Sequence, residues 1–186
     1  MVAAKKKVLV HACCAACASY LARQLGDEGF NPVIFFYNPN LSMGEYDKRL
    51  SGVKLLARQD NIGLIAPKRQ AEDYTVLISP FCDPASIKYI NDRERLERRC
   101  REILINLLLE RTAYETKQNR FHHFTTAMLC SPYRDHSTIW DMGLSAAKDH
   151  HLEFYYKDFR KGYWMGRNYA RKYNLSIPVY CSDYLG

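Results

Sequence analysis

The sequence predicts an α/β protein built on a parallel sheet. Short apolar runs rich in β-branched and aromatic residues alternate with longer segments whose apolar residues recur near the helical period. The clearest of these runs end in polar, turn-forming loops, as strands do where they leave a sheet. We therefore expect one α/β domain over residues 1–186, with a parallel, Rossmann-like sheet flanked by helices and a helical segment at about 84–120.

The first run, residues 8–10, ends abruptly in His11 and three closely spaced cysteines, Cys13, Cys14 and Cys17. Small residues and then a helical pattern follow, which indicates a strand, a tight loop and a helix. In open α/β sheets ligands bind at the carboxyl ends of the strands, and a helix N-terminus there favours anionic groups. The first strand is therefore expected to deliver thiols to a ligand-binding edge.

The later elements repeat this alternation. The first half should contain a strand over 32–37, a loop at 38–40, a helix over 45–62 and a strand over 64–66. The stretch 71–90 gives no clear pattern. The second half should contain a long helix from about 93 to 117, a strand over 124–129, a loop over 130–136, a helix over 139–150, a strand over 154–156 and a helix over 164–173.

The composition favours a polyanionic partner. The net charge is +7, with 14 tyrosines and 8 phenylalanines, so basic groups could meet phosphates while rings stack on unpaired bases. Basic surfaces can also serve solubility alone, so the net charge does not establish that the partner is a nucleic acid. The sequence contains seven cysteines. It shows no signal segment and no membrane span. We expect a cytoplasmic monomer without membrane contact, whose thiols serve metal or redox chemistry.

Several candidate residues have two readings. Adjacent Cys13 and Cys14 cannot bridge each other without strain but can bind different metals, although small buried cysteines also serve packing. His11 could be a ligand, yet a lone histidine at a strand end is more often a hydrogen-bonded core residue. Asp158 and Arg160 could clamp a substrate or pair on the surface, and their spacing does not decide. No glycine-rich phosphate loop is present.

A series of motifs occurs in a characteristic order along the chain. They are His11-Ala12-Cys13-Cys14-Ala15-Ala16-Cys17, Tyr37-Asn38-Pro39-Asn40, Glu45-Tyr46 with Arg49, Arg99-Cys100, Glu110-Arg111-Thr112-Ala113, Phe124-Thr125-Thr126, Ser131-Pro132-Tyr133, Asp158-Phe159-Arg160 and Tyr180-Cys181. In this order they resemble the cobalamin-independent epoxyqueuosine reductases, the QueH type, over nearly the whole chain.

The resemblance implies a fold similar to the adenine nucleotide alpha-hydrolases (HUP fold). It also implies a 4Fe-4S cluster with one adjacent iron, an external electron donor, and reduction of epoxyqueuosine to queuosine at the wobble position in the anticodon arm of tRNA. The metal ligands it implies are Cys13, Cys14, Cys17, Cys100, Cys181 and Asp183. For the substrate it implies Asn38, Asn40, Arg49, Ser131 and Tyr133 in binding and Asp158 and Arg160 in catalysis.

Two ligands that are usual in the family are missing or replaced. The long helix has Cys100 but no second thiol, since Ile103 and Leu104 cannot bind a metal, and Asp183 stands where a cysteine is usual. Three hypotheses follow: a reductase in which Cys82 or Cys17 takes a vacant position, an enzyme of the same fold with another metal and substrate, and a non-catalytic tRNA-binding relative. We favour the first.

Overall fold

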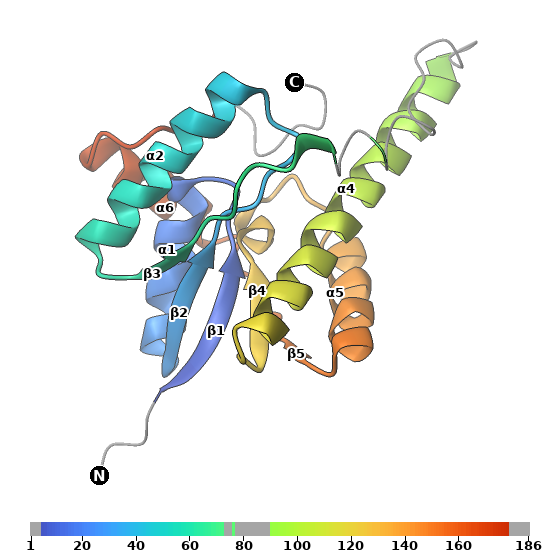
Figure 1. Ribbon diagram of the computed structural model, residues 1–186. Coiled ribbons are helices and arrows are strands. Elements are labelled where there is room, and N and C mark those ends of the chain that lie inside the picture. Colours follow the sequence, from blue (N-terminus) through green and yellow to red (C-terminus); the bar gives the residue numbers. More distant parts are fainter. Residues whose placement is uncertain (1–4, 73–75, 77–89, 179–186) are drawn as a thin grey trace.

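The computed structural model describes residues 5–72, 76 and 90–178, with side chains from residue 93 onward in the last range. Its centre is a sheet of five parallel strands in the order β3-β2-β1-β4-β5 (Figure 1). The strands are β1 (Lys6–His11), β2 (Phe30–Phe35), β3 (Gly63–Ile65), β4 (His123–Thr126) and β5 (Glu153–Phe154). The parallel α/β fold predicted from the sequence is therefore confirmed.

The central strand sets the register of the sheet. In β1, Val8 aligns with His123 of β4 and with Pro32 of β2, and Val8 to His11 are fully buried. A strand with helices over both faces is apolar throughout, which explains why residues 8–10 form a continuous apolar run. The carboxyl ends of β1, β2 and β4 consequently lie together at one edge.

Helices cover both faces of the sheet. The helices are α1 (Ala15–Asp27), α2 (Met43–Gln59), α4 (Ile90–Gln118), α5 (His136–His150) and α6 (Gly162–Lys172). Figure 1 shows α1, α2 and α6 on one side of the sheet and α4 with α5 on the other. Within the described ranges, no helix is long and apolar enough to cross a bilayer.

The prediction of a strand over 124–129 is wrong beyond Thr126. The chain leaves the sheet there and forms a 3₁₀ helix, η2 (Ala127–Cys130), because the Thr126 hydroxyl accepts a hydrogen bond from the Met128 amide at 3.2 Å. This contact caps the helix at its first turn. The predicted helical segment at 84–120 is α4, which spans Ile90–Gln118, and residues 84–89 lie outside the described ranges.

α6 crosses α1 at close range because two glycines remove side chains from the contact. A Cβ on Gly166 would lie 2.1 Å from the Ala16 carbonyl oxygen, and one on Gly162 would lie 1.8 Å from a ring carbon of Tyr20. On the same face, the Arg23 guanidinium lies 3.9 Å from the centre of the Tyr169 ring. α6 is therefore fixed directly against the first turn of α1, where Cys17 lies.

We expect Gly166→Ala to lower the free energy of unfolding by about 1–3 kcal/mol, because the new methyl group meets backbone that cannot move aside. Urea denaturation at neutral pH measures the change. The matched control is Gly44→Ala in the first turn of α2, where no atom of the described residues lies within 4 Å of the added Cβ. That variant should be unchanged or more stable by up to about 1 kcal/mol. Equal stabilities for both variants would contradict the close packing of α6 on α1.

Candidate active site at the carboxyl edge of the sheet

The direction in which the strands are added to the sheet changes between β1 and β4. From β1 the chain proceeds outward to β2 and β3, whereas β4 and β5 lie on the other side of β1. Connections that diverge in this way leave an opening at the carboxyl ends of the two central strands, where ligands of open α/β sheets bind. Here this position is occupied by Cys13 and Cys14 after β1, and by the buried η2 helix after β4.

His11 joins the ends of three strands. Its Nε2–H donates to the Tyr37 carbonyl oxygen at 3.0 Å, and the Thr126 hydroxyl donates to its Nδ1 at 3.0 Å. The carbonyl can only accept, which assigns the proton to Nε2 in a neutral ring. Burial lowers the pKa of His11 to about 4, only partly opposed by the Tyr37 hydrogen bond. The interpretation of His11 as a hydrogen-bonded core residue is thus confirmed.

The cysteine triplet lies buried at the tip of β1. Cys14 is the N-cap of α1, Cys17 lies in its first turn, and all three side chains are buried. A fourth thiol joins them from η2, because the Cys130 Sγ donates to the Cys17 carbonyl oxygen at 3.8 Å. Burial raises the pKa of Cys130 well above its ordinary value, and the nearby Cys14 adds to the shift. Cys130 is accordingly a neutral thiol.

Arg49 of α2 reaches the same thiols from the other side. Burial alone would lower its pKa, but the facing Cys13, the hydrogen-bonded Glu45 carboxylate and Cys14 raise it above the ordinary value. Its Nε donates to Glu45 Oε1 at 2.6 Å. Its buried Nη1 has no hydrogen-bond partner among the described residues. A cation with an unused donor therefore faces two thiols, and this favours negative charge at that point.

The loop after β2 and the loop after η2 hold the other predicted binding residues. Asn38 is buried, and its Nδ2 donates to the Ala12 carbonyl oxygen at 3.1 Å, while its Oδ1 lacks a partner within the described ranges. Asn40 is also buried. Ser131 is buried and accepts from the Tyr133 amide at 3.3 Å, whereas Tyr133 is 72% exposed. These residues all lie at the carboxyl edge, and their role in binding substrate stays a prediction.

Asp158 and Arg160 form an ion pair with each other. The Arg160 Nε lies 2.9 and 3.0 Å from the two Asp158 carboxylate oxygens, and the side chains are 51% (Arg160) and 46% (Asp158) exposed. The Arg160 side-chain hydrogen bonds hold the pKa of Asp158 well below its usual range. Of the two interpretations left open by the sequence, the structure therefore shows the pairing, and the role of the pair in catalysis stays a prediction. The amide of Phe159 donates to the Leu129 carbonyl oxygen at 3.3 Å, which keeps the pair beside η2.

The predicted metal ligands are only partly described. Cys100 is buried in α4 and is disulfide-bonded, so it would need reduction before it could bind a metal. Cys181 and Asp183, as well as Cys82, lie outside the described residues. Within the described ranges, no three His, Cys, Asp or Glu side chains are arranged to hold a metal ion. The metal ligand set therefore stays a prediction.

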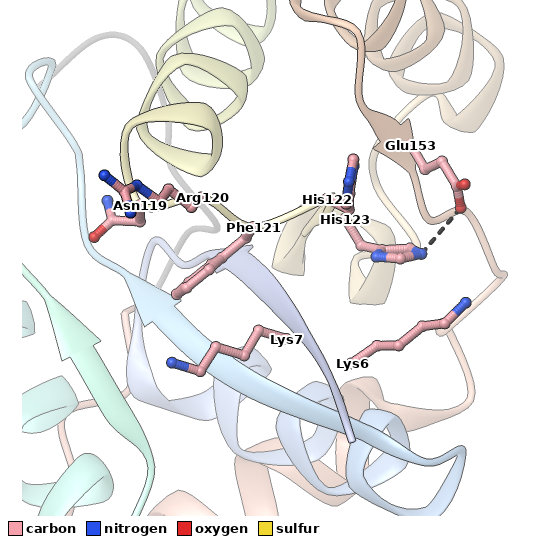
Figure 2. A pocket seen from close by; sticks show the side chains of 8 residues that line it. All are labelled: Lys6, Lys7, Asn119, Arg120, Phe121, His122, His123 and Glu153. Carbon is pink, nitrogen blue, oxygen red and sulfur yellow. Dashed lines mark ion pairs between the residues drawn. The ribbon is translucent and has the colours of Figure 1, made fainter. Parts of the chain in front are cut away.

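A separate cavity of about 480 Å³ lies at the opposite edge of the sheet. Figure 2 shows Lys6 and Lys7 of β1 on one side of it and the pair of His123 and Glu153, 3.0 Å apart, on the other. The Lys7 ammonium lies 5.2 Å from the centre of the Phe121 ring. None of the described residues that line the cavity carries a thiol, and the cavity lies at the amino ends of the strands. It is not where the sequence motifs converge.

Sequence reasoning missed two residues of this site. In the sequence Cys130 stands alone after the predicted strand, and only η2 brings it toward Cys17. Thr126 was part of a motif but had no assigned role, although it both caps η2 and bonds His11. The only signal in the sequence for these two residues was the polar loop that follows residues 124–129.

Comparisons with known proteins agree with the motifs. The family model described as epoxyqueuosine reductase QueH matches residues 8–184. Epoxyqueuosine reductase QueH of Thermotoga maritima is 30% identical over 177 residues, covering 94% of this chain and 86% of that protein. Epoxyqueuosine reductase QueH of Dehalococcoides mccartyi is 26% identical over 177 residues, covering 94% and 89%.

Among solved structures, a predicted subunit of tRNA methyltransferase from Methanocaldococcus jannaschii superimposes with a TM-score of 0.57 at 14% sequence identity. The superposition covers 96% of this chain and 82% of that one. Likeness at this level of identity shows the fold alone, and it supports the Rossmann-like α/β assignment.

The buried neutral His11 makes stability depend on pH. Its pKa is about 4 in the folded protein and about 6.5 when unfolded, so the unfolded state binds the proton first as pH falls. Between pH 7 and pH 5 this should cost about 2 kcal/mol of unfolding free energy in the wild type. Glutamine cannot titrate, so the unfolding free energy of His11→Gln, measured by urea denaturation, should fall by about 2 kcal/mol less than that of the wild type over the same pH interval. An identical pH dependence for both proteins would show that His11 is not held neutral.

Proposed function

This chain belongs to the epoxyqueuosine reductase QueH family and is an oxidoreductase that converts epoxyqueuosine to queuosine in tRNA, and we propose that it does so at the thiol-lined carboxyl edge of its sheet. We also propose that the site holds a 4Fe-4S cluster with one adjacent iron, that electrons come from an external donor, and that the reacting base is the wobble nucleotide of the anticodon arm.

One observation supports this location of the active site. Cys13 and Cys14 lie at the switch point of the sheet, facing a buried guanidinium, that of Arg49. The Nη1 of Arg49 has no partner within the described ranges, which is costly for a buried donor unless a group that the protein binds completes the bond. Thiolates and the sulfides of a cluster are anionic acceptors. The residue types and the charge at this edge thus support the proposal of a negatively charged iron–sulfur group, while the described side chains alone are not arranged to hold a metal ion.

Cys13, Cys14 and Cys17 would be the ligands from the described part of the chain. Cys100 after reduction, Cys181 and Asp183 would complete the set, and Asp183 would supply a hard oxygen donor suited to the adjacent iron. Removal of the epoxide oxygen takes two electrons and two protons and releases water. A cluster with a neighbouring iron supplies electron transfer and a Lewis acid for that oxygen.

The chain's own residues contribute charge and orientation. The Arg49 guanidinium stabilises negative charge on Cys13 and Cys14. The unused Asn38 Oδ1 can accept a hydrogen bond from the substrate, since its Nδ2 is already held by the Ala12 carbonyl. The neutral ring of His11 fixes the loop that follows β2 to the ends of β1 and β4. These contacts hold the binding groups in place before substrate arrives.

We expect Cys13→Ala and Cys14→Ala to abolish both iron binding and activity, because each removes a ligand at the tip of β1. Iron content and the absorption spectrum of anaerobically purified protein give the first readout. Conversion of epoxyqueuosine in substrate tRNA, followed by digestion and mass spectrometry, gives the second. The matched control is Cys130→Ala, which removes a neighbouring but neutral thiol and should change neither.

A double variant with Cys13→Ala and Cys14→Ala that kept full iron and full activity would refute this site. A wild-type protein that is free of iron and inactive but still binds tRNA would instead support the non-catalytic relative.

A second prediction concerns Asp158 and Arg160. Asp158→Asn and Arg160→Lys should each reduce kcat/KM at least about tenfold if the pair orients substrate, since both remove its bidentate geometry. The melting temperature should barely change, because exposed ion pairs contribute little to stability. Normal turnover with an unchanged melting temperature would leave the pair as a surface contact and remove it from the catalytic site.

A further inference from the structure

Two large aromatic side chains are exposed beside the thiol site. Tyr133, in the loop after η2, is 72% exposed, and Trp164, in the first turn of α6, is 60% exposed. Both contact the buried ring of Tyr163: the centroid of Tyr133 lies 5.7 Å away with the planes at 83°, and that of Trp164 lies 5.2 Å away at 79°. Tyr163 thereby orders two rings whose surfaces remain open to solvent.

This aromatic cluster is fixed to the elements that carry the thiols. Tyr133 follows three residues after Cys130, whose Sγ donates to the Cys17 carbonyl oxygen. Trp164 precedes Gly166 by two residues, and Gly166 lies directly against the Ala16 carbonyl. Both exposed rings are therefore held close to the first turn of α1. Rings that are already ordered lose little entropy when a ligand binds.

The charge around the cluster is positive. The Arg167 guanidinium lies 5.5 Å from the centre of the Tyr163 ring, and Lys161 at the N-cap of α6 is exposed. The nearby carboxylate of Asp158 is already neutralised by Arg160. Basic groups beside open rings match a nucleic acid strand, in which phosphates alternate with flat, apolar bases.

We propose that Tyr133 and Trp164, ordered by Tyr163, form a stacking platform for an unpaired nucleobase of the tRNA loop next to the nucleotide that reacts. This rests on the proposed function and names a binding surface for it. Sequence-specific proteins bind single-stranded loops by splaying bases onto aromatic side chains, and enzymes that modify a base must take it out of its stack. A platform beside the thiols would hold the flanking base while the target base enters the crevice.

The test uses an anticodon stem-loop RNA whose anisotropy reports binding at fixed salt. Trp164→Ala and Tyr133→Ala should each weaken its affinity by about 5- to 100-fold, the range for loss of one base–aromatic stack. Trp164→Phe should recover most of the loss because it restores a flat ring. The matched control is Tyr173→Ala at the other end of α6, where the ring is 38% exposed and contacts Tyr169 at 4.5 Å; it should bind within twofold of wild type.

A second readout reports stacking itself. 2-Aminopurine placed at loop positions that flank the wobble base loses fluorescence when it stacks on an aromatic ring. At one such position we expect quenching by the wild type that Trp164→Ala or Tyr133→Ala removes and Tyr173→Ala retains. Melting temperatures within a few degrees of wild type would confirm that these exposed substitutions leave the fold intact.

The outcomes separate this proposal from the proposed function. If the wild type reduces epoxyqueuosine but both alanine variants bind RNA within twofold of it, the platform is wrong and the activity stands. In that case the exposed rings belong to a protein-binding surface or to none. If the alanine variants lose RNA affinity and quenching while the wild type shows no reductase activity, the platform stands and the proposed function fails.

Discussion

The site depends on the burial of one neutral imidazole. His11 is the last residue of β1, and its two ring nitrogens bond the chain after β2, through the Tyr37 carbonyl, and the end of β4, through Thr126. Of the two neutral tautomers, only Nε2–H satisfies both partners. Without these bonds the strand ends would leave a buried carbonyl unsatisfied and would have no polar contact to fix their separation. A fully buried, uncharged ring therefore connects the strand ends at the edge that carries the cysteines.

The hydrogen bonds of His11 also determine which groups surround the thiols. Because the loop after β2 is fixed, Asn38 can bond Ala12, and because Thr126 ends β4, η2 turns Cys130 toward Cys17. Arg49 then meets Cys13 and Cys14 from α2, with a buried donor still unused within the described ranges. Three separate elements thus meet at one point, and α2 supplies the positive charge that favours an anion there. Preorganisation of this kind lets a site bind a charged group without reorganising the protein.

The sequence predicted what depends on local pattern and missed what depends on tertiary contacts. The apolar run of β1 and the periodic pattern of α2 predicted alternating strands and helices, and therefore a parallel sheet. The cysteine triplet indicated which edge of that sheet binds a ligand. The run over 124–129 has strand-like residues, so its change to η2 could not be seen without the Thr126 cap and the Phe159 amide bond to Leu129. Whether Asp158 pairs with Arg160 is likewise a matter of side-chain conformation that spacing does not determine.

The absence of a second thiol in α4 has a packing explanation. Cys100 and Leu104 are four residues apart on one face of the helix, both are buried, and Ile103 packs against the same core. Apolar side chains thus occupy the part of α4 in which a second thiol would be usual, and a thiolate there would have to be desolvated. Hydrophobic contacts, which do not depend on a bound metal, therefore secure this part of α4 to the sheet. If the proposed cluster is bound, the requirement for metal ligands would fall more heavily on Cys13, Cys14 and Cys17, and Arg49 lies close enough to Cys13 and Cys14 to interact with their charge.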